Sequence, residues 1–288
     1  MTHSRQIDGE TRLFGVLGHP VRASLSPAMH NAAFAALGMN ARYVPFPTLP
    51  EYLETAVRGL AKAGVAGFNL TVPHKQTILP LLDEITPQAR AIGAVNTVRV
   101  TDGQLHGANT DGDGLLAAID EALGFSCKGA QVLILGAGGA ARGIAFALLD
   151  AGASQLVISN RTAERAMELA KECARHFPKV EVTGISMDQA ATLTTGLVIN
   201  ATSVGMGDGH SPVRLDKMQI SAGVVDIVYN PLDTPLLLQA RALGLPTADG
   251  LGMLLHQGWL AFQFWTGVEP PLDVMRTALA KGLAQRER

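Results

Sequence analysis

The fold of this chain is decided by residues 132–141, VLILGAGGAA. The four apolar residues 132–135 are typical of a strand that is buried on both faces. The pattern G-x-G-x-x-A then runs from Gly136 to Ala141 and opens an alanine-rich helix. A turn that merely needs small residues would also use glycine, but the order of strand, glycines and helix favours a dinucleotide site. Gly136 would permit the tight turn, Gly138 the approach of a pyrophosphate and Ala141 close helix packing.

The second strand of this predicted unit, residues 155–159, ends in Asn160-Arg161-Thr162. An NAD site usually has Asp or Glu near this point, to accept a hydrogen bond from the ribose 2′-hydroxyl. Here Arg161 takes that place, and Arg165 follows one helical turn later. Guanidinium groups suit a 2′-phosphate, whereas cations at a helix N-terminus are otherwise mildly unfavourable. The segment therefore favours NADP over NAD, against the alternative of two solvated surface charges.

Short apolar strands alternate with helix-like patterns along the whole chain, which is typical of α/β proteins with parallel sheets. Pro27–Leu37 is expected to form a helix with Ser26 as its N-cap. Strands are expected at residues 13–17, 42–46, 66–70, 131–135, 155–159, 180–183, 197–200 and 224–227, with a hairpin of 94–100 and 104–108. Further helices are expected at 51–63, 113–123, 140–151 and 163–176, and two lie between 252 and 285. We expect the last two to pack back on the first domain.

Composition excludes several classes of protein. The chain has 288 residues and a formal net charge of −2, so it offers no broad attraction for nucleic acid or anionic membranes. No apolar run is long enough to span a membrane. The two cysteines, Cys127 and Cys173, stand far apart, and no His/Asp/Glu set has the spacing of metal ligands. We therefore expect a cytoplasmic protein without a metal site.

Polar clusters follow the strands predicted in the first domain. They include Ser24-Leu25-Ser26-Pro27, residues 69–75 (NLTVPHK), residues 93–97 (GAVNT) and residues 109–112 (NTDG). Ligands collect at the carboxyl ends of parallel strands, so hydroxyls, amides, a lysine and an aspartate there would suit a small polyol. Each cluster alone could equally be a cap, a turn or a surface charge.

Taken together, these motifs resemble those of the shikimate dehydrogenase family. The matching segments are S-x-S-P, N-x-T-x-P-x-K, G-A-x-N-T, N-T-D, GAGGA, N-R-T, residues 200–203 (NATS) and Asp249-Gly250 through Gln257. The resemblance covers nearly the whole length, from Ser24 to Gln257. It implies two three-layer α/β domains: a substrate domain with a mainly parallel sheet (residues 1–112 and 252–288) and a Rossmann domain that binds NADP (113–251). It also suggests a homodimer.

The resemblance further implies a role for each matching residue. Lys75 resembles the catalytic lysine, and Asp111 its carboxylate partner. The substrate-binding set is Ser24, Ser26, Asn69, Thr71, Asn96, Asp111, Tyr229 and Gln257. The cofactor-binding set is Gly136, Ala137, Gly138, Gly139, Ala140, Asn160, Arg161, Thr162, Arg165, Thr202, Ile227, Gly250 and Met253.

The implied activity is the reversible NADPH-dependent reduction of 3-dehydroshikimate to shikimate in chorismate and aromatic amino acid biosynthesis. A lysine suits it, because a donor aimed at the ketone oxygen stabilises developing negative charge and supplies a proton. A quinate/shikimate dehydrogenase of broader specificity, often using NAD, and a non-catalytic ligand sensor are the alternatives. His74 and His256 adjoin Lys75 and Gln257, but we favour structural roles for both.

Overall fold

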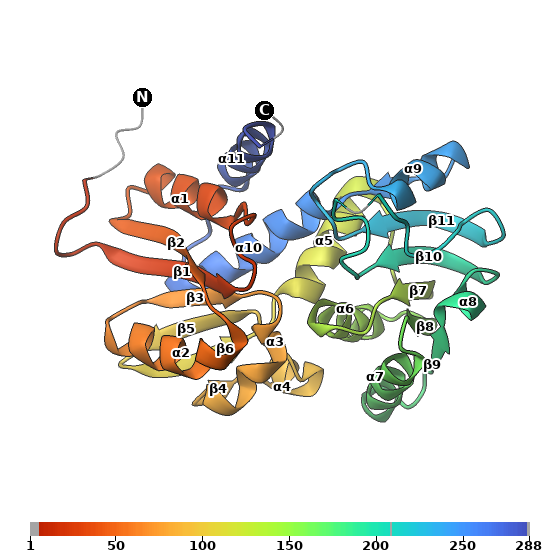
Figure 1. Cartoon of the computed structure of the whole chain (residues 1–288), viewed down its shortest axis with the longest axis horizontal. Coiled ribbons are helices and arrows are strands. Elements are labelled where there is room, and N and C mark those ends of the chain that lie inside the picture. Colours follow the sequence, from red (N-terminus) through yellow and green to blue (C-terminus); the bar gives the residue numbers. More distant parts are fainter. Residues whose placement is uncertain (1–5, 208, 287–288) are drawn as a thin grey trace. The chain divides into compact units, whose positions relative to one another are not determined.

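Two sheets organise the chain, and each belongs to its own compact unit of the computed structural model (Figure 1). The structure describes residues 6–207 and 209–286. The first unit contains the described residues up to Thr110 and those from Gln257 onward, and the second contains Asp111–His256. The α/β class predicted from the sequence is confirmed in both units.

The sheet of the first unit has the strand order β2-β1-β3-β5-β6-β4. Strand β5 runs antiparallel to its neighbours β3 and β6, whereas the other neighbouring pairs are parallel, so the sheet is mainly parallel. Its strands are β1 (Arg12–Gly18), β2 (Ala41–Pro47), β3 (Gly67–Leu70), β4 (Glu84–Ile85), β5 (Thr97–Thr101) and β6 (Gln104–Ala108). Its helices are α1 (Ser26–Ala36), η1 (Pro50–Tyr52), α2 (Leu53–Lys62), α3 (His74–Thr77), η2 (Leu79–Leu81), α4 (Pro87–Ile92) and α11 (Leu272–Ala284), with the later part of α10 (Gly250–Thr266).

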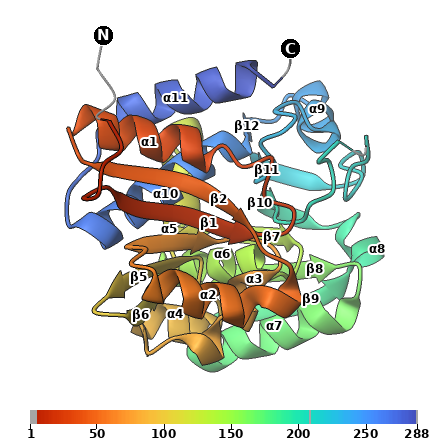
Figure 2. The same cartoon turned by 60° about the vertical axis from the view of Figure 1, so that its left-hand side comes forward.

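Helices cover both faces of this first sheet. On one face Leu17, Phe68 and Val98 pack with Val57 of α2 and Ala89 of α4. The opposite face carries aromatic side chains: Phe14 of β1 contacts Phe34 of α1 and Trp265 of α10. Because successive residues of a strand point to opposite faces, one short strand supplies both cores. Helix α11 packs on α1, as predicted, and Figure 2 shows the two side by side.

The second sheet has the order β9-β8-β7-β10-β11-β12, and all its neighbouring strands are parallel. This is the 3-2-1-4-5-6 order of a Rossmann domain, with its switch point between β7 and β10. The strands are β7 (Gln131–Leu135), β8 (Gln155–Asn160), β9 (Glu181–Ser186), β10 (Thr194–Asn200), β11 (Gln219–Asp226) and β12 (Thr247–Ala248). The helices are α5 (Asp111–Leu123), α6 (Gly139–Asp150), α7 (Ala163–His176), α8 (Met187–Ala190) and α9 (Pro235–Ala242), with the beginning of α10.

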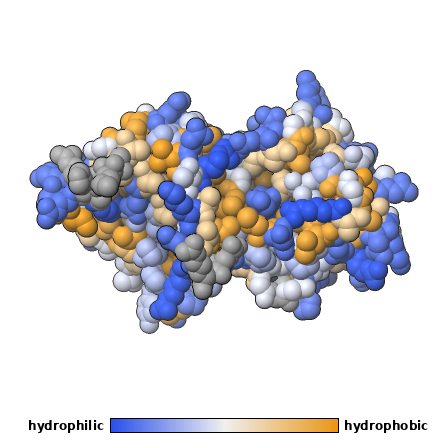
Figure 3. Space-filling model, turned by 90° about the horizontal axis from the view of Figure 1, so that it is seen from above, coloured by the Kyte–Doolittle hydropathy of each residue, from blue (hydrophilic) through white to orange (hydrophobic). Residues whose placement is uncertain are grey.

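Strand β7 is buried on both faces, as its continuous apolar run predicted. Leu133 and Leu135 pack with Leu236 of α9, and Val132 and Ile134, on the opposite face, are equally buried. On the face seen in Figure 3, hydrophilic residues are interspersed with hydrophobic ones. No helix among the described residues is long and apolar enough to span a membrane.

One predicted cap is wrong. Ser26 is the first residue of α1 rather than its N-cap, which is Leu25 with helical dihedral angles. The reason is local: the Ser24 hydroxyl, two residues earlier, accepts the Ser26 N–H at 3.2 Å. Helix α9 was not predicted. The sequence does contain its start signal, since Thr234 caps the helix and Pro235 begins it. Strands β4 and β12 have two residues each, too few to show a period.

Helix α1 buries a histidine in the aromatic core of the first unit. His30 is 0% exposed, and neither ring nitrogen has a hydrogen-bond partner among the described residues. Its ring stacks on Tyr43 at 4.5 Å between centroids and also lies against Phe262 and Trp265. Burial lowers the pKa of His30 from 6.5 to about 3, so the ring is neutral at physiological pH.

We therefore expect His30 to cause part of the acid sensitivity of folding. As pH falls below 6.5, the unfolded chain binds a proton at this ring that the folded chain does not bind, so stability is lost on the acid side. Between pH 7 and pH 4.5, wild type should lose roughly 2 kcal/mol more stability than His30→Phe. Urea unfolding at several pH values measures this. His210→Phe, with a ring exposed in the folded chain, serves as control. Parallel stability curves for wild type and His30→Phe would contradict the expectation.

Candidate active site

The predicted substrate residues of the first unit gather at one edge of its sheet, the edge formed by the carboxyl ends of β1 and β3. Ser24 lies between β1 and α1, Ser26 is the first residue of α1, and Asn69 lies in β3. Thr71 follows β3 directly. Because β5 is antiparallel to β3, with Asn69 paired to Thr97, the start of β5 lies at this same edge. Local strand order thus brings side chains together that are far apart in the sequence.

Asn69 is the centre of a buried hydrogen-bond network. Its Oδ1 accepts from the Tyr43 hydroxyl at 2.7 Å. Its Nδ2 donates to the Asn96 carbonyl at 3.1 Å and to Thr97 Oγ1 at 3.0 Å. The Tyr43 hydroxyl also hydrogen-bonds the side chain of Ser26. The side chain of Asn69 therefore connects β2, β3 and the start of β5 at this edge.

Tyr43 is held firmly on the edge strand β2. The side chain of Asn31 in α1 accepts the Tyr43 N–H and donates to the Tyr43 carbonyl, both at 2.8 Å. The ring is 1% exposed and stacks on His30. Burial raises the pKa of Tyr43 well above 10, while the hydrogen bond with Ser26 lowers it. Its hydroxyl is thus a donor at neutral pH, as the bond to Asn69 requires.

Asn96 extends the network toward Gln257. Its Oδ1 accepts the Thr110 N–H at 2.9 Å and the Thr97 hydroxyl at 2.9 Å. Its Nδ2 donates to Thr110 Oγ1 at 2.9 Å, with Gln257 Oε1 at the limit of hydrogen-bond distance, 3.5 Å. Four of the predicted substrate residues, Ser26, Asn69, Asn96 and Gln257, are thereby connected.

Lys75 lies in the short helix α3, directly after the loop that leaves β3. Its carbonyl accepts the Val95 N–H at 2.7 Å, which ties α3 to the segment just before Asn96. The Lys75 side chain is half-buried. The role of Lys75 as a proton donor stays a prediction.

The glycine turn of the second unit lies at the switch point of its sheet. Gly136 has a φ of 115°, and a Cβ there would approach the Ala201 carbonyl to 2.9 Å, so only glycine fits. Gly138 is the N-cap of α6 without a side-chain cap bond, and a Cβ there would meet nothing within 4 Å. No side chain thus caps the first N–H groups of α6, and such groups suit an anion.

The cationic side chains predicted to bind a 2′-phosphate lie after β8. Arg161 and Arg165 are both exposed near the start of α7, with Thr162 as its N-cap. The side chain of Asn160 donates to the Thr162 carbonyl at 2.9 Å, which orders this turn. Gly138 and these two arginines follow neighbouring parallel strands, so they share the carboxyl edge of the sheet.

The remaining cofactor residues follow β10 and β11, apart from two in α10. Thr202 lies two residues past β10, and Ile227 directly follows β11. Gly250 begins α10 against this loop: a Cβ there would approach the Ile227 carbonyl oxygen to 2.2 Å, so only glycine allows the contact. Met253 is buried one turn further along α10. All four belong to the second unit, which also holds the glycine turn.

Asp111 and Tyr229 belong to the second unit, whereas Lys75 belongs to the first. Asp111 begins α5 and is 2% exposed, and Tyr229 lies half-buried in the loop after β11. The partnership of Lys75 with Asp111 stays a prediction.

The two histidines next to predicted site residues make local contacts. His74 is 0% exposed and its Nε2 lies 2.8 Å from the Thr48 carbonyl. His256 Nε2 lies 3.0 Å from a carboxylate oxygen of Glu121. These contacts favour structural roles. Within residues 6–207 and 209–286, no group of His, Cys, Asp and Glu could hold a metal ion.

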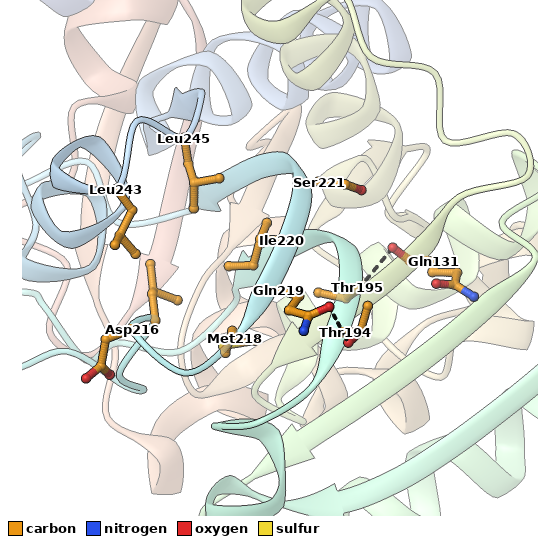
Figure 4. A pocket seen from close by; sticks show the side chains of 11 residues that line it. Gln131, Thr194, Thr195, Asp216, Met218, Gln219, Ile220, Ser221, Leu243 and Leu245 are labelled. Carbon is orange, nitrogen blue, oxygen red and sulfur yellow. Dashed lines mark hydrogen bonds between the residues drawn. The ribbon is translucent and has the colours of Figure 1, made fainter.

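A pocket of about 450 Å³ lies at the other end of the second sheet, where β7, β10 and β11 begin (Figure 4). Gln131 and Thr194 line it, and some of its polar groups bind one another, such as Thr195 Oγ1 with the Gln131 carbonyl at 3.1 Å. Ligands of doubly wound sheets bind at the opposite, carboxyl edge. This pocket is therefore separate from the predicted dinucleotide site.

Sequence reasoning missed the residues that connect the site. Tyr43, Thr97 and Thr110 were not selected as binding residues, although the structure places them between residues that were. In the sequence, nothing distinguishes Tyr43 from an ordinary aromatic residue of the hydrophobic core. Asp226, buried at the end of β11, was missed because an aspartate after an apolar run looks like the start of a loop.

Three family models match the chain: the shikimate dehydrogenase substrate binding domain (residues 16–98), shikimate / quinate 5-dehydrogenase (118–205) and the shikimate 5′-dehydrogenase C-terminal domain (250–280). A curated shikimate dehydrogenase (NADP+) of Geobacter sp. (strain M21) is 50% identical, covering 96% of this chain and 98% of that protein. That of Methanopyrus kandleri is 46% identical, covering 98% and 100%. The crystal structure of shikimate 5-dehydrogenase from Thermus thermophilus with NADP(H) and shikimate has a TM-score of 0.86 and 41% identity, covering 95% and 100%.

The Tyr43 hydroxyl should contribute measurably to the stability of the first unit. Tyr43→Phe leaves the buried Asn69 Oδ1 without its donor, so we expect a loss of about 1–3 kcal/mol in the free energy of unfolding. Tyr52→Phe, at a ring that is 59% exposed, is the matched control and should change little. Chemical denaturation of the three proteins gives the answer, and equal stabilities would mean that the Tyr43–Asn69 bond contributes nothing.

Proposed function

The chain belongs to the shikimate dehydrogenase family, and from this premise we propose that it catalyses the reversible NADPH-dependent reduction of 3-dehydroshikimate to shikimate. This reaction belongs to chorismate and aromatic amino acid biosynthesis. The observation that carries this function is similarity over nearly the full length to NADP-dependent shikimate dehydrogenases. The first unit would bind the substrate and the second the cofactor. The buried free thiols of Cys127 and Cys173 support a reducing compartment, the cytoplasm. The homodimer suggested by the sequence stays a prediction.

The second unit fits NADP at its carboxyl edge. The residues that would hold the pyrophosphate are Gly136 to Ala140, because no side chain caps the N-terminus of α6 and a Cβ at Gly138 would meet nothing within 4 Å. Arg161 and Arg165 would hold the 2′-phosphate through charge and forked donors. Asn160, Thr162, Thr202, Ile227, Gly250 and Met253 complete the proposed contacts. When bound, NADPH supplies a hydride to the carbonyl carbon of the substrate.

The first unit would bind and protonate the substrate. Ser24, Ser26, Asn69, Thr71, Asn96 and Gln257, with Asp111 and Tyr229 of the second unit, form the proposed substrate-binding set. Reduction of the ketone leaves negative charge on oxygen, which Lys75 would stabilise as a cation and neutralise by giving its proton. In the reverse direction, Lys75 takes the proton from the hydroxyl of shikimate. Asp111 is its proposed carboxylate partner.

A spectrophotometric assay tests this function. Shikimate or quinate is mixed with NADP or NAD, and the absorbance of the reduced cofactor is followed. We expect the fastest turnover with shikimate and NADP, and a loss of about 10²- to 10⁴-fold in kcat for Lys75→Ala with little change in the KM for shikimate. Circular dichroism checks that the variant is folded. Equal rates with quinate and NAD would indicate the broader enzyme, and no turnover under any pairing would refute the proposal.

Arg161 should set the preference for NADP. In Arg161→Asp, a carboxylate replaces the guanidinium beside the proposed 2′-phosphate, so the ratio of kcat/KM for NADP to that for NAD should fall at least about tenfold. Arg175→Asp makes the same charge change in the last turn of α7, the helix that follows Arg161, and should keep the wild-type ratio. An unaltered ratio in Arg161→Asp would show that this segment does not select the cofactor.

A further inference from the structure

Asp226 is a buried carboxylate that the proposed reaction does not use. It is the last residue of β11 and is 0% exposed. None of the ion pairs found in the described part of the chain includes it. Burial raises its pKa, and hydrogen bonds from its neighbours lower it. A carboxylate in such a place is costly unless donors surround it, so its partners define what it does.

Three segments of the second unit donate hydrogen bonds to this carboxylate. Asn200 Nδ2, at the end of β10, and the Val228 N–H, in the loop after β11, donate to Oδ1 at 2.9 and 3.0 Å. The hydroxyl of Thr234, the N-cap of α9, donates to Oδ2 at 2.7 Å. Asp226 thus joins the ends of two neighbouring strands to the start of a helix.

The carboxylate also fixes which way the Asn200 amide points. Because Asp226 only accepts, the NH₂ of Asn200 must face it, and the second N–H of that group donates to the Val204 carbonyl at 3.1 Å. Asn200 Oδ1 must then face the other way. There it accepts from Thr202 twice, from the N–H at 3.0 Å and from the hydroxyl at 2.7 Å. The amide is fully used, so turning it over would break these bonds.

The orientation of the Asn200 amide determines which group of Thr202 faces the glycine turn. Its hydroxyl proton is committed to Asn200, and its Oγ1 accepts the Val204 N–H at 3.1 Å. Its methyl carbon, Cγ2, lies 3.1 Å from the point where a Cβ of Gly136 would stand. The loop of residues 201–204 is therefore held against the glycine turn by bonds that lead back to Asp226.

We propose that Asp226 is a positioning residue for the dinucleotide site: through Asn200 it sets the 201–204 loop, and through Val228 it sets the loop that carries Ile227 and Tyr229. This role rests on the proposed NADP site of the same unit. In this role, Asp226 raises the affinity of the site for the cofactor through hydrogen-bond geometry. The charge itself is secondary.

Three variants test the role. Asp226→Ala removes the acceptor from all three donors, and the KM for NADP should rise about tenfold or more while the KM for shikimate changes little. Asp226→Asn should recover most of that loss, to within about threefold of wild type, because its amide oxygen can replace Oδ1 and the Thr234 hydroxyl can turn to accept from its NH₂. Val224→Ala, a buried position on the same face of β11, is the control for mere loss of stability. Assays are run where circular dichroism shows every variant folded.

Each outcome is decisive. If Asp226→Ala and Val224→Ala give the same KM for NADP at matched loss of thermal stability, the role of Asp226 is only structural and the inference fails. If Asp226→Asn is as impaired as Asp226→Ala, the charge matters rather than the geometry, which also overturns it. Should Asp226→Ala not fold, Asn200→Ala cuts the same link and must raise the KM for NADP.

Failure of the proposed function is seen separately, in the wild-type protein. If wild type does not turn over shikimate, the proposed reaction is wrong, and the fluorescence of NADPH on binding replaces the KM as readout. The dissociation constants of the same variants for NADPH then test the positioning role alone. Wild-type affinity for NADPH in Asp226→Ala would refute it.

Discussion

A buried amide at the end of a strand must find partners for both its oxygen and its nitrogen within the protein, and much of both sites depends on this constraint. Asn69 lies in β3 and is 6% exposed, and Asn200 ends β10 and is 0% exposed. The backbone ladder ends at these points, so the amides continue the pairing with side chains and loops. Each one converts the end of a strand into a fixed framework for the polar residues around it.

The two amides are oriented by different chemistry. Asn69 Oδ1 accepts a hydrogen bond from a phenol, Tyr43, whose backbone is held by Asn31 and whose ring stacks on His30. Asn200 is oriented by a carboxylate, Asp226, which can only accept. A phenol fixes an amide through one donor and one direction, whereas the carboxylate collects several donors at once. The first arrangement suits a pocket edge lined by hydroxyls and amides, and the second suits two loops that must stay in register.

The sequence predicted most of what is local and little of what is cooperative. The run from Val132 to Ala141 specifies a strand, a turn that needs glycine and a helix start, and each of these depends on neighbours in the chain. Tyr43 could not be recognised in this way, because its contact with Asn69 requires two parallel strands to be placed first. Ser26 was misassigned as a cap for a related reason: whether Ser24 or Ser26 serves the helix start depends on a turn that composition does not specify.

The placement of tryptophan has a practical consequence for measuring this protein. The chain has two, Trp259 and Trp265, and both lie in the part of α10 that belongs to the first unit. Each indole N–H donates to a carbonyl, of Pro270 and Val98 respectively, at 2.9 and 3.0 Å. Intrinsic emission therefore reports the integrity of one unit only. Melting that is seen in the peptide circular dichroism but not in tryptophan emission belongs to the other, so ordinary spectroscopy can separate the two without any label.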